Sequence, residues 1–145
     1  PLQKGDFFLD VGTGSGILMV VAAKLGAARL LGVDSDEMAT GIAERNLLIN
    51  QVSRNRFSLK TGTLLNGIDG RYRLVAANIL LKEIQALLDD VKNHLTTGGV
   101  FICSGFIEKN CESIVAKMTS QGLKVLEIQK ESEWVAIAAK SRDPS

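Results

Sequence analysis

Three glycines and one acidic residue near the start of the chain have the types and spacing to bind a cofactor. The segment LDVGTGSG, residues 9–16, carries alternating glycines at Gly12, Gly14 and Gly16. Asp10 stands just before them, at the end of an apolar run. Turns of this kind bind nucleotide cofactors, because their backbone approaches the ligand closely and the following helix presents free N–H groups. We therefore expect Asp10 and the three glycines to form a cofactor-binding turn.

The spacing of the glycines argues against a dinucleotide. The dinucleotide fingerprint is G-x-G-x-x-G, and its third glycine lets the helix pack closely against the strand. Here the pattern is G-x-G-x-G, and the third position of the fingerprint is Ile17. A β-branched residue is a poor substitute at that position, which counts against NAD, NADP and FAD.

The charge of Asp10 favours a cationic cofactor over a phosphate. A carboxylate at the end of the strand would repel a pyrophosphate by about 1–4 kcal/mol at 4 Å. S-adenosylmethionine has no phosphate, and its sulfonium and α-ammonium groups are both positive. An alternative role for Asp10 is to accept hydrogen bonds from the N–H groups of the turn itself.

A second acidic residue is placed to bind a ribose. Asp34 ends the next apolar run, 22 residues after Gly12, where a carboxylate can accept hydrogen bonds from both ribose hydroxyls. Every adenosyl cofactor has that ribose, so Asp34 indicates a nucleoside without choosing among nucleosides. Asp36, two residues later, is better explained as the N-cap of the following helix.

Strand-like and helix-like segments alternate along the chain. We expect seven strands, at 7–11, 29–33, 56–61, 74–77, 100–104, 125–129 and 134–139. We expect helices at 17–25, from 35–37 to about 50, at 84–95 and at 107–118. The last two strands are joined by a short polar link, and such a link permits only an antiparallel hairpin. This order predicts an α/β fold with a doubly wound, mostly parallel seven-stranded sheet whose last strand is antiparallel.

Length, composition and charge exclude several kinds of partner. The 145 residues are 46% hydrophobic and fit one soluble globular domain. The net charge is +1, without a basic run that would bind nucleic acid directly, and no apolar stretch reaches the roughly 20 residues of a membrane span. The two cysteines, Cys103 and Cys111, show no metal-ligand spacing. We expect no metal and a reduced, cytoplasmic protein.

Two residues that often do chemistry are assigned other roles. His94 is the only histidine and falls late in an expected amphipathic helix. We expect it at the surface or as a partner of the helix dipole, rather than as a base. Trp134 begins an apolar strand, so we expect it in the core, unless its strand lies at an edge of the sheet.

These segments together resemble the class I S-adenosylmethionine-dependent methyltransferases, through LDVGTGSG and the later GVDSD. Three further segments resemble the catalytic domain of the ribosomal protein L11 methyltransferases: VAANIL (75–80), GGVFICSGFIEK (98–109) and ESEWVAIAAK (131–140). The resemblance covers nearly the whole chain. It is most selective in the ANIL segment and the EWVA ending.

The resemblance implies S-adenosylmethionine as the cofactor and assigns roles to single residues. Gly12 would lie against the cofactor, and Asp34 would hold its ribose. Gly62 and Thr63 would lie near the adenine. Asn78 would line the place where methyl donor and acceptor meet, with its side-chain oxygen accepting a hydrogen bond from the incoming N–H. An alternative role for Asn78 is to cap the following helix.

The resemblance implies a protein N-methyltransferase that acts on amino groups of ribosomal protein L11 or of another protein. Two alternatives stay open: an RNA or small-molecule methyltransferase on the same fold, and a cofactor-binding module that is inactive in this form. Arg73 departs from the family, which usually has an acid there. Only eight residues precede Leu9. We expect residues 1–145 to be the catalytic domain, without an upstream segment that contributes to the cofactor site and without a substrate-binding domain.

Overall fold

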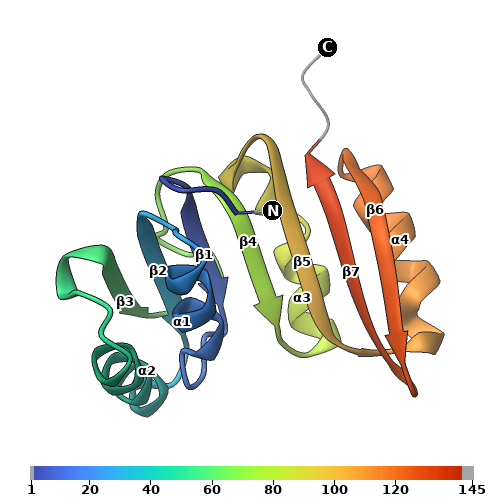
Figure 1. Cartoon of the computed structure of the whole chain (residues 1–145). Coiled ribbons are helices and arrows are strands. Elements are labelled where there is room, and N and C mark those ends of the chain that lie inside the picture. Colours follow the sequence, from blue (N-terminus) through green and yellow to red (C-terminus); the bar gives the residue numbers. More distant parts are fainter. Residues whose placement is uncertain (1, 142–145) are drawn as a thin grey trace.

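A seven-stranded mixed sheet organises the chain, and the computed structural model describes residues 2–141 (Figure 1). The strands are β1 (Phe7–Val11), β2 (Arg29–Asp34), β3 (Phe57–Thr61), β4 (Tyr72–Asn78), β5 (Leu95–Ile107), β6 (Leu123–Glu131) and β7 (Trp134–Ser141). Their order in the sheet is β3-β2-β1-β4-β5-β7-β6. Only β7 runs antiparallel to its neighbours. The predicted fold class and the antiparallel last strand are confirmed.

Helices cover both faces of the sheet. They are α1 (Ile17–Lys24), α2 (Glu37–Ile49), α3 (Leu81–Leu87) and α4 (Cys111–Ser120), with short 3-10 turns at Arg54–Arg56, Val91–His94 and Glu108–Asn110. Met19 of α1 and Leu47 of α2 share one buried cluster with Phe8 of β1. Ile84 of α3 and Ile114 of α4 share the other with strands β4, β5 and β7. α1 and α2 therefore lie on one face, and α3 and α4 lie on the other (Figure 1).

The strand order reverses direction at β1, and this reversal determines where a ligand can bind. β1 pairs with β2 on one side and with β4 on the other. Val11, the last residue of β1, aligns with Val33 and with Ala77. In open α/β sheets, the crevice at the carboxyl ends of strands beside such a reversal is the usual ligand site. The glycine turn, Asp34 and Asn78 all follow strands that end in this crevice.

The helix expected at 84–95 is much shorter in the structure. α3 ends at Leu87, a 3-10 turn covers Val91–His94, and Leu95 already begins β5. The apolar residues that suggested one long helix are all buried: Ile84, Leu87, Leu88, Val91 and Leu95. The prediction was wrong because regular apolar spacing reports burial on one side of the chain. It does not report that the backbone stays helical between the buried positions.

β5 is longer than expected at both ends. It begins at Leu95, the last residue of the helix expected at 84–95, and it includes Ile107, the first residue of the helix expected at 107–118. Arg73 of β4 donates a hydrogen bond to the carbonyl of Gly98. The arginine that departs from the family pattern therefore ties β4 to the beginning of β5.

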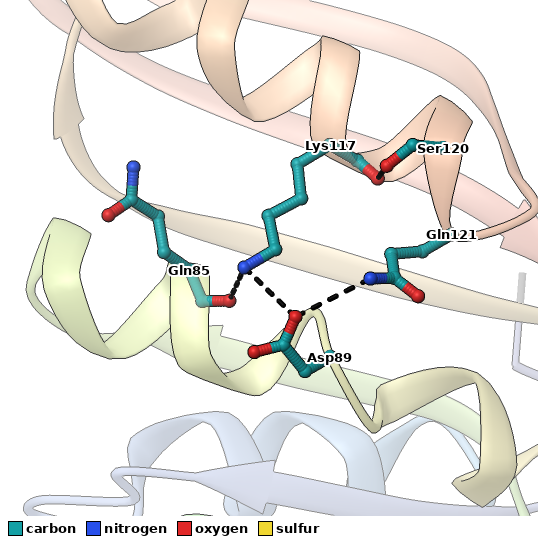
Figure 2. Close-up of polar contacts among 5 residues, drawn as sticks. All are labelled: Gln85, Asp89, Lys117, Ser120 and Gln121. Atoms are coloured by element: carbon teal, nitrogen blue, oxygen red, sulfur yellow. Dashed lines mark hydrogen bonds and ion pairs between the residues drawn. The ribbon is translucent and has the colours of Figure 1, made fainter.

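A polar cluster fixes the early end of α3 against α4 (Figure 2). Lys117 of α4 lies 3.0 Å from the carboxylate of Asp89 and donates a hydrogen bond to the carbonyl of Gln85 in α3. The side-chain amide of Gln121 donates to the same carboxylate at 3.4 Å. A positive charge at the C-terminal end of a helix is favourable, because the last carbonyls have no partner within the helix.

One half of the sheet has a helix on only one face. Within residues 2–141, no helix covers β5, β7 and β6 on the side that carries α1 and α2 (Figure 1). Ile102 of β5 points to this side and is 36% exposed. The neighbouring helix α1 exposes Ile17, Val21 and Leu25, the last at its C-cap. Across the same described range, no helix is long and apolar enough to cross a membrane.

We predict that Lys117→Met lowers the free energy of unfolding by about 1 kcal/mol, because it removes the bonds to Asp89 and Gln85 and keeps the aliphatic stem. Denaturant unfolding measures this loss. Lys82→Met, at an exposed lysine of α3, is the matched control and should change stability little. Equal stability of the two variants would contradict a stabilising role for the cluster.

Candidate functional site

The glycine turn allows two segments to come unusually close to the end of β1. Gly12 has a φ of 75°, and a Cβ atom on it would lie 2.4 Å from Cγ2 of Ile79, just after β4. Gly16 has a φ of 82°, and a Cβ atom there would lie 2.9 Å from Cβ of Ala43 in α2. Gly12 therefore lets the segment after β4 approach the end of β1 at the crevice. Gly16 instead lets α2 pack against the start of α1.

A smaller cavity of about 170 Å³ opens beside the turn. Its lining comes from the carboxyl ends of β1, β2 and β3 and from α3: Val11, Gly12, Val33, Asp34, Ser35, Gly62, Thr63, Leu64 and Glu83. Four residues predicted to contact the cofactor are brought together here: Gly12, Asp34, Gly62 and Thr63. The other predicted residues of the turn, Gly14 and Gly16, are absent from the lining of this smaller cavity.

Asp34 joins the turn to the loop after β2 and keeps free acceptor capacity. Its Oδ2 accepts a hydrogen bond of 2.9 Å from the N–H of Gly14, and its Oδ1 accepts one of 2.9 Å from the N–H of Asp36. Each carboxylate oxygen has a second lone pair, so Asp34 can also accept bonds from a ligand in the smaller cavity. Asp36 accepts a bond of 2.9 Å from the N–H of Met38 and is the N-cap of α2. That predicted role is confirmed.

Asp10 lies beneath the turn and lines neither of the two cavities of the crevice. It is 1% exposed, and its Oδ1 has no hydrogen-bond partner among residues 2–141. Burial raises the pKa of Asp10 to about 7; the hydroxyl of Thr13 opposes this rise, and the charge of Asp34 adds to it. The alternative role for Asp10 is wrong, because the N–H groups of Gly12 and Thr13 donate to Val33 and that of Gly14 donates to Asp34. A buried carboxyl group with an unpartnered Oδ1 at this place would be stabilised in its charged form by a nearby cation.

A larger cavity of about 680 Å³ is lined by Ile79, the residue that packs against Gly12. It is formed by the ends of β4 and β5 and by the β6–β7 hairpin: Asn78, Ile79, Leu80, Ser104, Gly105, Gln129, Lys130, Glu131, Trp134, Val135 and Ala136. Asn78 is exposed, and no described residue bonds its side-chain amide. The alternative that Asn78 caps α3 is wrong, because the N-cap of that helix is Leu80. Its amide is thus available to a ligand in this cavity.

Trp134 was expected in the core and instead lines the larger cavity with 54% of its surface exposed. Its neighbours Val135 and Ile137 occupy the buried side of β7. Successive side chains of a strand point to opposite faces, so the buried position of Val135 places Trp134 outside the core. The alternation within WVAIA was the available signal, since it permits only every second residue to be buried.

His94 also differs from the expectation. Its side chain is 12% exposed, and its Nε2 lies 3.4 Å from the carboxylate of Asp90. It belongs to the 3-10 turn Val91–His94 and lines neither cavity of the crevice. The side chain is therefore more buried than the predicted surface position, because it lies in the turn that leads into β5. The alternative role, as a partner of the helix dipole, stays a prediction.

This chain is similar to known proteins in both sequence and structure. The sequence profile described as Ribosomal protein L11 methyltransferase (PrmA) matches residues 2–142. The chain belongs to the ribosomal protein L11 methyltransferase family. A family member from Clostridium perfringens is 43% identical over 131 residues, and one from Desulfosudis oleivorans is 43% identical over 141 residues. These matches cover 90% and 96% of this chain but only 41% and 47% of the relatives. The chain thus spans less than half the length of these curated family members.

Solved structures support the family assignment and the fold. The crystal structure of ribosomal protein L11 methylase from Lactobacillus delbrueckii subsp. bulgaricus superimposes with a TM-score of 0.92 and 29% identity, covering 97% of this chain and 72% of that one. Precorrin-6y C5,15-methyltransferase from Geobacter metallireducens gives a TM-score of 0.82 with 16% identity, covering 98% and 82%. The second likeness shows only that the family shares its sheet with other methyltransferases.

We predict that Asp10→Asn changes how stability depends on pH. Between about pH 4 and 7 the folded wild type keeps Asp10 protonated while the unfolded chain ionises it, so folding takes up a proton. The stability of the wild type relative to Asp10→Asn should be highest below the unfolded pKa of 3.8. It should fall, by on the order of 4 kcal/mol, as pH rises to 7. Denaturant unfolding of both proteins across this range measures it, and parallel curves would contradict it.

Proposed function

We propose that this chain is the catalytic part of an S-adenosylmethionine-dependent protein N-methyltransferase that acts on amino groups of ribosomal protein L11. The observation that carries the proposal is a pair of cavities at the carboxyl ends of the strands, one lined by Gly12 and Asp34 and the other by Asn78 and Ile79. Gly12 and Ile79 pack against each other. A group-transfer enzyme needs such neighbouring sites, because donor and acceptor must meet in a fixed orientation. Membership of the L11 methyltransferase family supports the choice of reaction and substrate.

We assign the smaller cavity to the nucleoside part of the cofactor. Asp34 would accept hydrogen bonds from the ribose hydroxyls, while Gly62 and Thr63 would lie beside the adenine. Gly12 would offer its backbone at close range, and the buried carboxyl of Asp10 would favour the positive groups of the ligand electrostatically. When bound, S-adenosylmethionine supplies a methyl group already activated by its sulfonium leaving group.

We assign the larger cavity to the acceptor amine. An amine can accept a methyl group only through its lone pair, and a lysine ammonium has a pKa near 10.4 in water, so its proton must leave first. The side-chain oxygen of Asn78 would accept a hydrogen bond from the neutral amine and orient it. The exposed Trp134 and Leu80 would pack against an aliphatic stem, and Glu131, which pairs with Trp134 across the β6–β7 hairpin, would attract the incoming ammonium.

An RNA acceptor has less support than a protein amine. Among residues 2–141, Lys130 is the only cationic side chain in the lining of the larger cavity, and its Nζ is bonded to the carboxylate of Glu108 at 2.8 Å. Glu131 adds a negative charge at the same rim. Phosphate binding relies on several unpaired cations, so this rim suits an ammonium ion better than a nucleic-acid backbone.

We also propose that residues 1–145 work within a longer cytoplasmic protein. The relatives are more than twice as long as the matched segments, and the substrate-binding part would lie outside this chain. The exposed apolar side chains of α1 and Ile102 form surface of the kind that another domain covers. Cys103 and Cys111 are free thiols, which fits a reducing compartment.

The proposed activity is tested by methyl transfer from labelled S-adenosylmethionine. We expect label on recombinant ribosomal protein L11 and none on a ribosomal RNA transcript. Calorimetry with S-adenosylmethionine runs in parallel and reports binding alone. Tight binding without label on any ribosomal protein would contradict the proposed activity and leave a cofactor-binding module.

We predict that Asp34→Ala weakens S-adenosylmethionine binding roughly 10- to 150-fold, which corresponds to the loss of about 1.5–3 kcal/mol from a charged hydrogen-bond partner. Calorimetry measures the change. Asp36→Ala is the matched control: it removes the N-cap of α2 and should lower stability by about 1 kcal/mol without weakening cofactor binding. Unchanged affinity in Asp34→Ala would show that another residue binds the ribose.

A further inference from the structure

A bulge in β5 places a glycine against the end of β4. Ser104 pairs with Ala136 of β7 and Phe106 pairs with Val135, so Gly105 is the extra residue between two consecutive pairs. Its φ is 103°, in the left-handed region that favours glycine. Bulges of this kind redirect a strand and recur beside active sites. Here the bulge lines the larger cavity, beside Asn78.

Gly105 approaches both the backbone and the side chain of the Asn78–Ile79 segment. A Cβ atom on Gly105 would lie 2.4 Å from the carbonyl oxygen of Ile79 and 3.0 Å from Oδ1 of Asn78. The first distance is impossible for real atoms, and a backbone carbonyl cannot rotate away as a flexible side chain can. Any side chain at position 105 would therefore displace the segment that carries the Asn78 amide.

The same segment is held from its other side by the glycine turn. Gly12 leaves room for Cγ2 of Ile79, and the N–H of Ile79 donates a hydrogen bond of 3.3 Å to the carbonyl of Ser104. Ile79 thus lies between two glycines, one from the end of β1 and one from the bulge in β5. Ile79 lines the larger cavity and packs against Gly12, which lines the smaller one, so the position of Ile79 depends on both glycines.

We propose that Gly105 is a positioning residue for methyl transfer, which sets where Oδ1 of Asn78 lies in the larger cavity. The inference rests on the proposed function, because it assigns the Asn78 oxygen to the acceptor amine. A displacement of 1 Å in such an alignment can cost about 100-fold in rate. The smaller cavity does not include Gly105, so cofactor binding should be nearly independent of this residue.

The test compares Gly105→Ala with Gly5→Ala. Gly5 has a φ of 95° and no atom within 4 Å of an added Cβ, so it carries similar backbone strain without the contact. We expect Gly105→Ala to lower kcat about 10- to 100-fold while the dissociation constant of S-adenosylmethionine changes less than about threefold. Gly5→Ala should leave both values unchanged, and thermal unfolding of both variants measures the shared cost of strain.

A double-mutant cycle separates positioning from general damage. If Gly105 acts through Asn78, then Gly105→Ala should lower kcat no further in a protein that already carries Asn78→Ala. Wild-type kcat in Gly105→Ala would overturn the proposal. So would a fully additive loss in the double variant, or a loss of cofactor affinity as large as the loss of rate.

A spectroscopic measurement keeps the inference distinct from the proposed activity. The side-chain amide of Asn78 and the backbone N–H of Ile79 give separate NMR signals whether or not methyl transfer occurs. We expect both signals to shift in Gly105→Ala and to stay in place in Gly5→Ala. Unmoved signals would overturn the positioning role, whereas shifted signals in a protein without transferase activity would count against the proposed function alone.

Discussion

The approach of the glycine turn to the end of β4 is the contact on which both cavities depend. Without a Cβ atom, Gly12 lets Ile79 come within a distance that no other residue would permit. The bulge at Gly105 in β5 contacts the Asn78–Ile79 segment as well. The smaller cavity, lined by Gly12 and Asp34, and the larger one, lined by Asn78 and Ile79, thus share this contact between their linings. Transfer between two ligands requires that their reactive atoms meet, so the two sites must lie close together.

This contact exists because the strand order reverses at β1. A strand flanked by β2 and β4 brings together residues separated by long stretches of chain, and the loops after these strands end at one edge. The apolar core supports that edge from below: Val11, Val33 and Ala77 are all buried in it. The contacts of Lys117 keep the short α3 against α4 on one face of that sheet.

The burial of Asp10 costs stability, while its charge can favour a positive ligand. A carboxyl group with 1% exposure and an unpartnered oxygen destabilises the folded chain whenever it is charged. Its pKa near 7 means that the charge is only partly present at neutral pH. A positive ligand beside the turn would lower that pKa and offset part of the cost. The acid can thus serve electrostatically without contacting the smaller cavity, which is a different role from a direct ligand.

Several features of the fold and the site could be predicted from local patterns. The glycine spacing, the acid that ends β2 and the short link before the last strand each depend on few neighbouring residues. They indicated the turn, the place of Asp34 and the antiparallel β7. The length of α3 could not be predicted, because its apolar spacing continues through a 3-10 turn into β5 and every one of those residues is buried.

By itself, the sequence determined the order of strands and helices along the chain, the family and the place of the glycine turn after the first strand, since these follow from periodicity, turn chemistry and motif spacing. Only the tertiary structure decided that Asp10 is buried, that Trp134 faces a cavity, and that Gly12 and Gly105 hold the Asn78–Ile79 segment between them. Those outcomes depend on which surfaces of distant segments pack together. Burial and close contact between strands are properties of the assembled sheet, and no local pattern records them.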